Sequence, residues 1–332
     1  MSKIWRDNVR RIGENLKQNI VFTVVTPVFN GEKYLRETID SVLFNIDFMN
    51  TEYIVVDDGS TDRTAEILRD YQDKIRVISK VNQGQAKAIN EGLKLAKGEF
   101  ALIVNVDDPL VSKKLFSISH EIFRTDPSIV VTYPNWTIIN QSGNFIKSVQ
   151  PKEYSVRELL GNFNCLVGPG GVFRIKNALQ IGGWNSSYRF VPDYDFWLRM
   201  STQGKFRKIP ENLAVWRSHE SSLSVGGRSL EMAQERIRVI ENFLLKHPQD
   251  KIISENALSN AYFRASLLVF FDSRVPARIY LKKSFQHSKR TILNKNKFVL
   301  IYLLLSPLAV RITNKEIFRK FLVRFSNFMD LT

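Results

Sequence analysis

The feature that most constrains the fold is a regular alternation of short apolar runs with longer amphipathic stretches, which begins at residue 21. Each apolar run has the length of a β-strand, and the stretches between the runs space their apolar residues as helices do. Strands that alternate with helices of about 10–15 residues indicate βαβ units, and therefore an α/β fold with a mostly parallel sheet flanked by helices. We expect strands at 21–26, 53–58, 75–79, 100–106 and 129–134, and helices at 31–45, from about 61, at 84–97 and at 112–125.

Three polar clusters follow three of these strands, at 26–30, 57–62 and 105–109. Open α/β sheets bind ligands outside the carboxyl ends of their strands, so the clusters mark the expected site. A dinucleotide-binding Rossmann enzyme needs a GxGxxG phosphate loop after its first strand. The segment Pro27–Glu32 holds no such loop, which argues against that class of enzyme.

The second cluster places two consecutive carboxylates, Asp57 and Asp58, directly before a glycine. Carboxylates do not hold phosphate by themselves, but they accept hydrogen bonds from a nucleobase N–H or a ribose hydroxyl. Capping of the next helix is the alternative explanation for Thr61 or Asp62. Because capping leaves both earlier carboxylates unexplained, the cluster predicts nucleoside binding.

The third cluster also contains adjacent carboxylates, Asp107 and Asp108, just after Asn105. Neighbouring carboxylates repel each other unless a cation or a set of donors holds them, and hard oxygen ligands suit magnesium or manganese. Such an ion bridges a diphosphate and neutralises a departing nucleotide. A solvated acidic turn that caps the helix at 112–125 is the alternative.

Two later stretches add candidate residues. Asp193 and Asp195 are two positions apart in a helical pattern, so they cannot share one helix face. Asp193, at the start of this helix, either faces a site or caps the helix. Arg217 and His219 lie among hydroxyl residues and suit a diphosphate or its metal, with a purely structural histidine as the alternative.

Taken together, these stretches resemble a family 2 glycosyltransferase with the GT-A fold, a Rossmann-like α/β architecture. The resemblance extends over about 21–225 and departs from the common pattern at Asn105, where aspartate is frequent, and at Pro192, where glutamate is frequent. The motifs that carry it are Thr26–Gly31, Val56–Asp62, Asn82–Asn90, Gly92, Ala96–Glu99, Asn105–Asp108, Gly182–Trp184, Asp193–Arg199 and Arg217–His219.

The resemblance implies transfer of a sugar from a nucleoside diphosphate sugar to an acceptor hydroxyl, with inversion and with Mn²⁺ or Mg²⁺. The resemblance implies that Asp193 is the general base. It also implies that Asp108 is the first candidate for a metal ligand and that Asp107 contacts the ribose or the metal. His219 would approach the metal or the leaving diphosphate. The implied nucleotide-binding residues are Pro27, Phe29, Asn30, Glu32, Asp57 or Asp58, Asn82, Gln83, Gly84, Lys87 and Asp107.

Uridine is the first expectation for the donor, because uracil offers an N–H to a carboxylate such as Asp57 or Asp58. The expected acceptor is a saccharide or a lipid-linked glycan, in the synthesis of a cell-surface polysaccharide or a lipid-linked oligosaccharide. A non-catalytic, glycan- or lipid-binding member of the same fold is the alternative. Such a member should lack the acidic pair or the base, whereas this chain retains them.

The charge of the chain is concentrated after residue 250. Residues 251–332 hold 15 of the 48 basic side chains and 4 of the 33 acidic ones. Basic residues there alternate with apolar runs such as Phe298–Val310, which is shorter than the ~20 residues of a spanning helix. This pattern favours an anionic membrane surface over nucleic acid as partner; a solvated basic face is the alternative.

The sequence therefore predicts three regions: an amphipathic segment at 1–20, a GT-A domain at 21–227 and a basic helical region at 228–332. The first region lacks the apolar core of a secretory signal. The single cysteine, Cys165, excludes an internal disulfide and a Cys-rich zinc site. Together these observations favour a cytoplasmic protein that lies peripherally on the inner face of the plasma membrane.

Overall fold

The computed structural model describes residues 20–47, 50–219, 229–270 and 272–288. The chain forms two compact units, and each unit is built from several segments that alternate along the sequence. The first contains the described residues up to Lys152, together with Val167–Ser186 and Met200–His219. The second contains Glu153–Leu166, Ser187–Arg199 and the described residues after His219.

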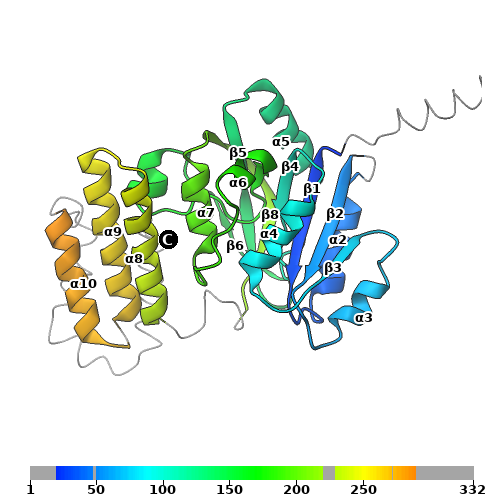
Figure 1. The fold of residues 1–332 in the computed structure, drawn as a ribbon, viewed down its shortest axis with the longest axis horizontal. Coiled ribbons are helices and arrows are strands. Elements are labelled where there is room, and N and C mark those ends of the chain that lie inside the picture. The colour runs from blue at the N-terminus through cyan, green and yellow to red at the C-terminus, as the bar shows by residue number, and fades with distance from the viewer. Residues whose placement is uncertain (1–19, 48–49, 220–228, 271, 289–332) are drawn as a thin grey trace, which may run out of the picture. The chain divides into compact units, whose positions relative to one another are not determined.

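The first unit is built on an eight-stranded sheet with the order β3-β2-β1-β4-β7-β5-β6, in which β8 also pairs with β5 (Figure 1). β3, β2, β1 and β4 are parallel, whereas β7 is antiparallel to both of its neighbours. The predicted α/β fold with a mostly parallel sheet is therefore confirmed. The strands are β1 Phe22–Val28, β2 Thr51–Asp57, β3 Arg76–Ser79, β4 Phe100–Ile103, β5 Ile129–Ile139, β6 Phe145–Val149, β7 Val172–Arg174 and β8 Lys205–Arg217.

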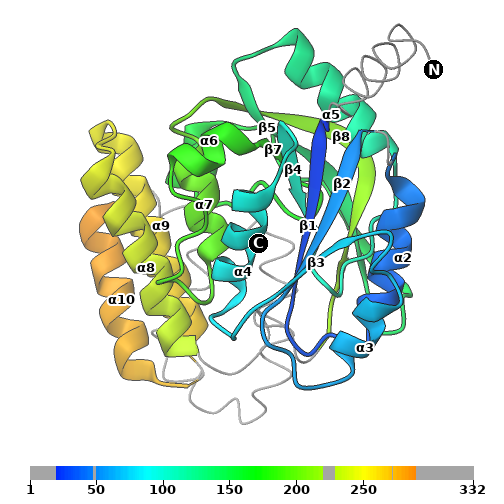
Figure 2. The ribbon, with the colours of Figure 1, turned by 45° about the vertical axis from the view of Figure 1, so that its right-hand side comes forward.

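Helices cover both faces of this sheet. The helices of the first unit are α2 Leu35–Asn45, α3 Thr64–Arg69, α4 Gln85–Leu95, α5 Lys114–Thr125 and α6 Ile175–Gln180. Alternate residues of β1 point to opposite faces, so Val24 joins the core formed with α2, α3 and α5. Val25 faces α4 instead, where the backbone of Gly92 approaches so closely that a Cβ there would lie 2.5 Å from a valine methyl. Figure 2 shows α4 and α2 on opposite sides of β1 and β2.

β4 and β5 depart most from the predicted strand lengths. β4 ends at Ile103 because the chain turns there, with the Asp108 N–H donating to the Asn105 carbonyl. β5 continues to Ile139 because β8 pairs along it as far as Arg217. A hairpin then follows, with β6 antiparallel to the end of β5.

The second unit is helical. It contains the short π-helix η1 Arg157–Gly161, α7 Pro192–Met200 except for its last residue, α8 Ser229–Lys246, α9 Lys251–Val269 and α10 Arg274–His287. α9 packs against η1, α8 and α10. Its apolar core draws on all three long helices, with Phe263 and Ala265 of α9 fully buried. The Asp250 side chain accepts a hydrogen bond from the Ile253 N–H and so caps α9.

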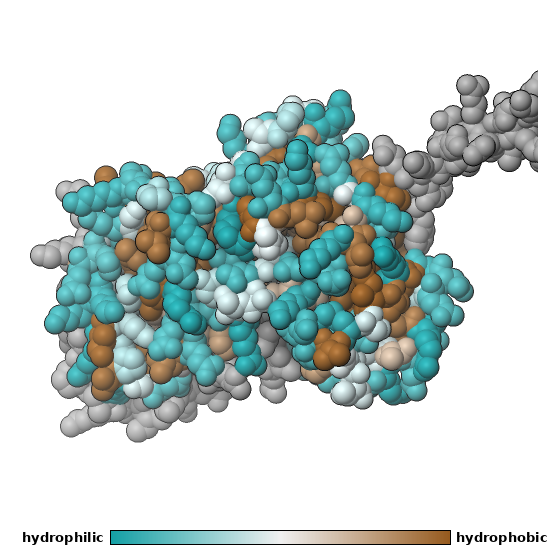
Figure 3. All heavy atoms as spheres, in the orientation of Figure 1, coloured by the Kyte–Doolittle hydropathy of each residue, from teal (hydrophilic) through white to brown (hydrophobic). Residues whose placement is uncertain are grey.

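None of the helices formed by the described residues is both long and apolar enough to cross a bilayer. The predicted amphipathic segment, up to residue 19, and the apolar run Phe298–Val310 lie outside the described residues. On the face drawn in Figure 3, polar residues predominate and apolar residues form separate patches. Val275 and Ile279 of α10 are among the exposed apolar side chains.

Candidate functional site

Side chains of the loop after β1 hold the loop after β2. Asn30, which has a left-handed backbone with φ of 52°, accepts a hydrogen bond from the Thr61 N–H on its side-chain oxygen at 2.8 Å. Its own N–H donates to Ser60 Oγ. Glu32 Oε2 accepts from the Arg63 N–H at 3.0 Å, just before α3. The structure thus joins two of the three polar clusters at the carboxyl edge of the sheet.

The two carboxylates at the carboxyl end of β2 have different hydrogen-bond partners. Asp58 is buried, and its oxygens accept from Lys80 Nζ at 2.5 Å and from the N–H groups of Gln83 and Gly84. Asp57 is also buried, and from the residues that the structure describes it accepts one hydrogen bond, that of the Ser60 N–H on Oδ1. Asp58 is therefore fully engaged in holding the chain before α4, whereas Asp57 keeps one carboxylate oxygen for a ligand.

The segment held by Asp58 borders a cavity of about 400 Å³ in the first unit. Gly84 has φ of 92° at the start of α4, with open space on the side where a side chain would lie. The amide of Asn90 bonds in both directions to the backbone of Trp184, which holds the turn Gly182–Gly183 against α4. The cavity is lined by Lys80, Gln83, Lys87, Asn90, Glu91, Lys94, Leu179, Gly182 and Gly183.

In the acidic pair after β4, too, one carboxylate is engaged in hydrogen bonds with the surrounding chain and the other is more open. Asp108 is buried and accepts from the Arg217 N–H at 2.8 Å and from Asn105 Nδ2 at 3.0 Å. Burial, and then the charge of Asp107, raise the pKa of Asp108 to about 8. Asp107 Oδ2 lies 2.7 Å from His219 Nε2. The structure therefore brings Asp107, Asp108 and His219 together.

Asn105 has a clear role in this arrangement. Its amide nitrogen donates to Asp108, while its oxygen accepts from Gln85 Nε2 of α4 at 3.0 Å. An aspartate at this position has no hydrogen to donate and would add a third carboxylate. The asparagine thus satisfies a buried carboxylate where another acidic residue would repel it.

Arg217 fixes the acidic loop from the opposite side. Its guanidinium group is buried and donates to the Asp107 carbonyl at 2.9 Å, to Glu37 Oε1 at 2.7 Å and to the Gln141 carbonyl at 3.3 Å. It also lies over the ring of Tyr34, 4.9 Å from the centroid. These bonds leave Arg217 as a structural cation rather than a group that faces a ligand.

The donor set at this loop fits a divalent metal. Asp107 and His219 offer an oxygen and a nitrogen in mutual contact. Among the residues that the structure describes, no group of three or more His, Cys, Asp or Glu side chains forms a complete metal site. Magnesium is commonly bound through one or two carboxylates, with the remaining ligands from substrate phosphates and water, and Asp107 offers one such carboxylate.

Asp193 lies in the second unit, in the first turn of α7. Its side chain reaches solvent, yet enough protein surrounds it that burial raises its pKa above the ordinary value. N–H groups of the first helical turn and the charge of Arg236 oppose this rise. Asp195, on another face of α7, bonds to Arg199 Nε at 2.8 Å and has the more conventional structural role.

The turn before α7 is held by a buried carboxylate of α8. Glu235 accepts hydrogen bonds from the N–H groups of Arg189, Phe190 and Val191, at 2.9, 2.5 and 2.9 Å. Three charge-assisted bonds fix the backbone that leads into Asp193. Glu235 is therefore a positioning residue for the start of α7.

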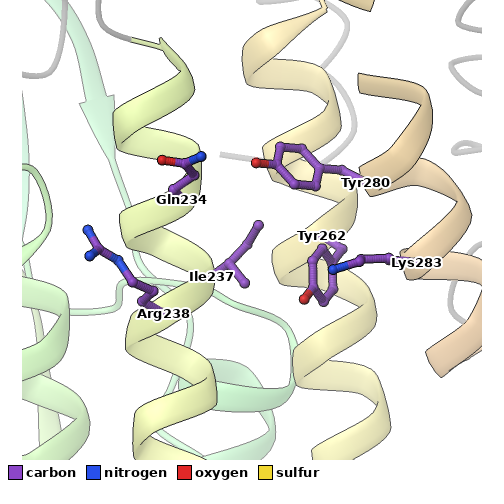
Figure 4. A pocket seen from close by; sticks show the side chains of 6 residues that line it. All are labelled: Gln234, Ile237, Arg238, Tyr262, Tyr280 and Lys283. Carbon is purple, nitrogen blue, oxygen red and sulfur yellow. The ribbon is translucent and has the colours of Figure 1, made fainter. Parts of the chain in front are cut away.

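The second unit has a cavity of about 250 Å³ between α8, α9 and α10 (Figure 4). Tyr262 donates to Glu241 at 2.7 Å, and Lys283 lies over its ring. The lining residues are Gln234, Ile237, Arg238, Tyr262, Tyr280 and Lys283. This cavity is polar and aromatic, and its lining includes neither a carboxylate nor a histidine.

Comparisons with known proteins identify the family of the chain. The family profile described as Glycosyl transferase family 2 matches residues 23–177. An uncharacterized glycosyltransferase of Rickettsia typhi is 30% identical over 265 residues, which are 77% of this chain and 82% of the relative. The chain belongs to glycosyl transferase family 2.

Solved structures show the same fold as this glycosyltransferase. Residues 1–349 of Staphylococcus aureus TarS, in complex with UDP-GlcNAc, match with a TM-score of 0.58 and 17% identity, over 82% of this chain and 90% of that one. The mannosyltransferase PcManGT of Pyrobaculum calidifontis, in complex with GDP-Man and Mn²⁺, matches with a TM-score of 0.51 and 15% identity. That match covers 87% of this chain and 85% of the other.

The structure separates the remaining predicted site residues of the glycosyltransferase by exposure. Pro27 is buried within β1, whereas Phe29 is 49% exposed at the strand's end. The backbone of Asn82 lies against Gly59. Sequence analysis missed Glu37, Lys80 and Glu235, because the partners of each lie at least 22 positions away in the chain.

Proposed function

We propose that this glycosyltransferase moves a sugar from a nucleoside diphosphate sugar to an acceptor hydroxyl with inversion at the anomeric carbon. The observation that carries the proposal is the contact of Asp107 with His219, at the sheet edge where the loops after β1 and β2 also meet. The product would belong to a cell-surface polysaccharide or a lipid-linked oligosaccharide.

The first unit would bind the donor. Asp57 has a carboxylate oxygen that can accept from a base N–H or a ribose hydroxyl, whereas both oxygens of Asp58 are engaged. A uracil N–H suits the first of these partners, and the UDP-GlcNAc complex of TarS supports uridine. Lys87, at the rim of the larger cavity, would contribute positive charge toward the phosphates.

Asp193 would act as the general base. It removes the proton of the acceptor hydroxyl as the hydroxyl oxygen attacks the anomeric carbon, and the bond to the diphosphate oxygen breaks in the same displacement. A raised pKa suits this task, because a stronger base takes the proton more readily. Asp107 and His219 would hold a divalent metal, which when bound stabilises negative charge on the leaving diphosphate.

A nucleotide-sugar hydrolysis panel tests the proposal. The full chain with Mn²⁺ or Mg²⁺ should hydrolyse a UDP-sugar slowly without acceptor, and Asp107→Asn should remove this activity while the protein stays folded. Asp73→Asn, at an exposed carboxylate of the same unit, is the matched control and should behave as the wild type. Preference for a GDP-sugar would overturn the uridine assignment. No turnover and no nucleotide binding would favour the non-catalytic alternative.

A further inference from the structure

Two arginines of the second unit form no ion pair with the residues that the structure describes. Arg236 of α8 and Arg264 of α9 are both half-buried. Neither guanidinium group makes a hydrogen bond or an ion pair with any residue that the structure describes. Burial lowers the pKa of each arginine, and the charge of Arg236 lowers that of Arg264 further. Two poorly hydrated positive charges therefore act on each other without a neutralising group in contact.

An aromatic support holds one of them. Arg264 lies over the ring of Phe163, 5.7 Å from its centroid. Phe163 in turn makes an edge contact of 4.9 Å with Tyr194, the residue after Asp193. Phe163 has φ of 53°, a left-handed conformation that is uncommon for a bulky side chain and that recurs at ligand sites. The support thus connects Arg264 to the start of α7.

Arg236 is also connected to the start of α7. Arg236 follows Glu235, whose carboxylate holds the backbone of Phe190 and Val191. The charge of Arg236 lowers the pKa of Asp193, although the two side chains form no ion pair. Arg236 therefore acts on Asp193 itself, while Arg264 is connected through Phe163 to the neighbouring Tyr194.

We propose that Arg236 and Arg264 bind a phosphate group of the acceptor, which brings the hydroxyl to be glycosylated beside Asp193. The planar forks of two guanidinium groups match the oxygens of a phosphate, and such bonds are among the strongest in proteins. The phosphate belongs either to a lipid headgroup or to a soluble phosphorylated glycan. This inference rests on the proposed function only for the role of Asp193, since the phosphate site is testable by itself.

Binding of sn-glycerol 1-phosphate to the full chain is the direct test. We expect wild-type binding with and without saturating UDP, and a loss of about 10-fold or more in Arg236→Gln and in Arg264→Gln. Arg238→Gln is the matched control, since Arg238 is two positions along the same helix and lines the cavity of Figure 4 instead. Equal affinity in all four proteins, loss only in the control, or no binding by the wild type would overturn the proposal.

A second measurement needs no substitution, so it holds even if the variants fold poorly. Cys165 is the single cysteine of the chain and is exposed, and a negative charge on its sulfur would act on Arg236. Glycerol phosphate should slow alkylation of Cys165 by iodoacetamide at least several-fold, and glycerol should not. Equal alkylation rates with the two compounds would overturn the proposal.

An experiment with lipid vesicles distinguishes the two sources of the phosphate. If it is a lipid headgroup, sedimentation with phosphatidylglycerol vesicles should weaken in Arg236→Gln but not in Arg238→Gln, and soluble glycerol phosphate should compete. If vesicle binding is the same in both variants while glycerol phosphate binding differs, the phosphate is that of a soluble glycan. If the chain binds glycerol phosphate but turns over no nucleotide sugar, the transferase proposal is rejected and this site is retained.

Discussion

The two units handle their buried positive charge in opposite ways. In the first, Arg217 donates to Glu37 and to two carbonyl groups, so its charge is used within the protein. In the second, Arg236 and Arg264 have no such partners among the described residues. An arginine whose donors are satisfied within the protein holds a loop, whereas a half-buried arginine without such bonds keeps its donors for solvent or a ligand. The contrast assigns a structural role to one cation and a binding role to the others.

The largest expected effect is on the base of the second unit. Asp193→Asn should lower turnover by roughly 10²–10⁴-fold, as expected when a positioned base is lost, and should leave donor affinity nearly unchanged. Asp195→Asn is its control, because Asp195 bonds to Arg199 within the same helix. Steady-state kinetics with nucleotide binding by calorimetry would measure both. Near-normal turnover of Asp193→Asn would reduce this residue to a helix cap.

A smaller effect is expected on the stability of the first unit. Arg217→Met should lower the free energy of unfolding by about 2–3 kcal/mol, because it removes a charged hydrogen bond and leaves two carbonyl groups without their donor. Arg207→Met, at an exposed position of the same strand, should stay within about 0.5 kcal/mol of the wild type. Urea unfolding would measure the difference. Equal stability of the two variants would contradict the structural role of Arg217.

The smallest effect concerns pH. Burial raises the pKa of Asp193 and Arg236 lowers it, so the two influences oppose each other. The base must be deprotonated, so activity should fall as the pH drops through this raised pKa, above the ordinary range for aspartate. Arg236→Gln removes the positive charge and should move this acidic limb to higher pH. The pH profile of donor hydrolysis measures this shift. If the acidic limb of Arg236→Gln lies at the same pH as that of the wild type, the charge of Arg236 does not act on the base.

The sequence predicted the first unit better than the second because the signals there are local. The apolar runs predicted the strands of this unit. Their positions in the sequence also predicted that the two acidic pairs lie at the carboxyl ends of β2 and β4. It did not distinguish Asp57 from Asp58, since the difference depends on Lys80 and two backbone N–H groups. Arg264 was not recognisable either, because its ring partner Phe163 is 101 positions away.

The hydrogen bonds of Glu235 limit how the helical region can be exchanged between related proteins. Its carboxylate binds the turn at Arg189–Val191, so α8 and the start of α7 are hydrogen-bonded although more than 40 residues separate them. A chimera that exchanges α8 onward between relatives would leave three N–H groups of this turn facing a foreign surface. The transplantable module is instead discontinuous: Glu153–Leu166 and Ser187–Arg199 would have to travel with the helices after them.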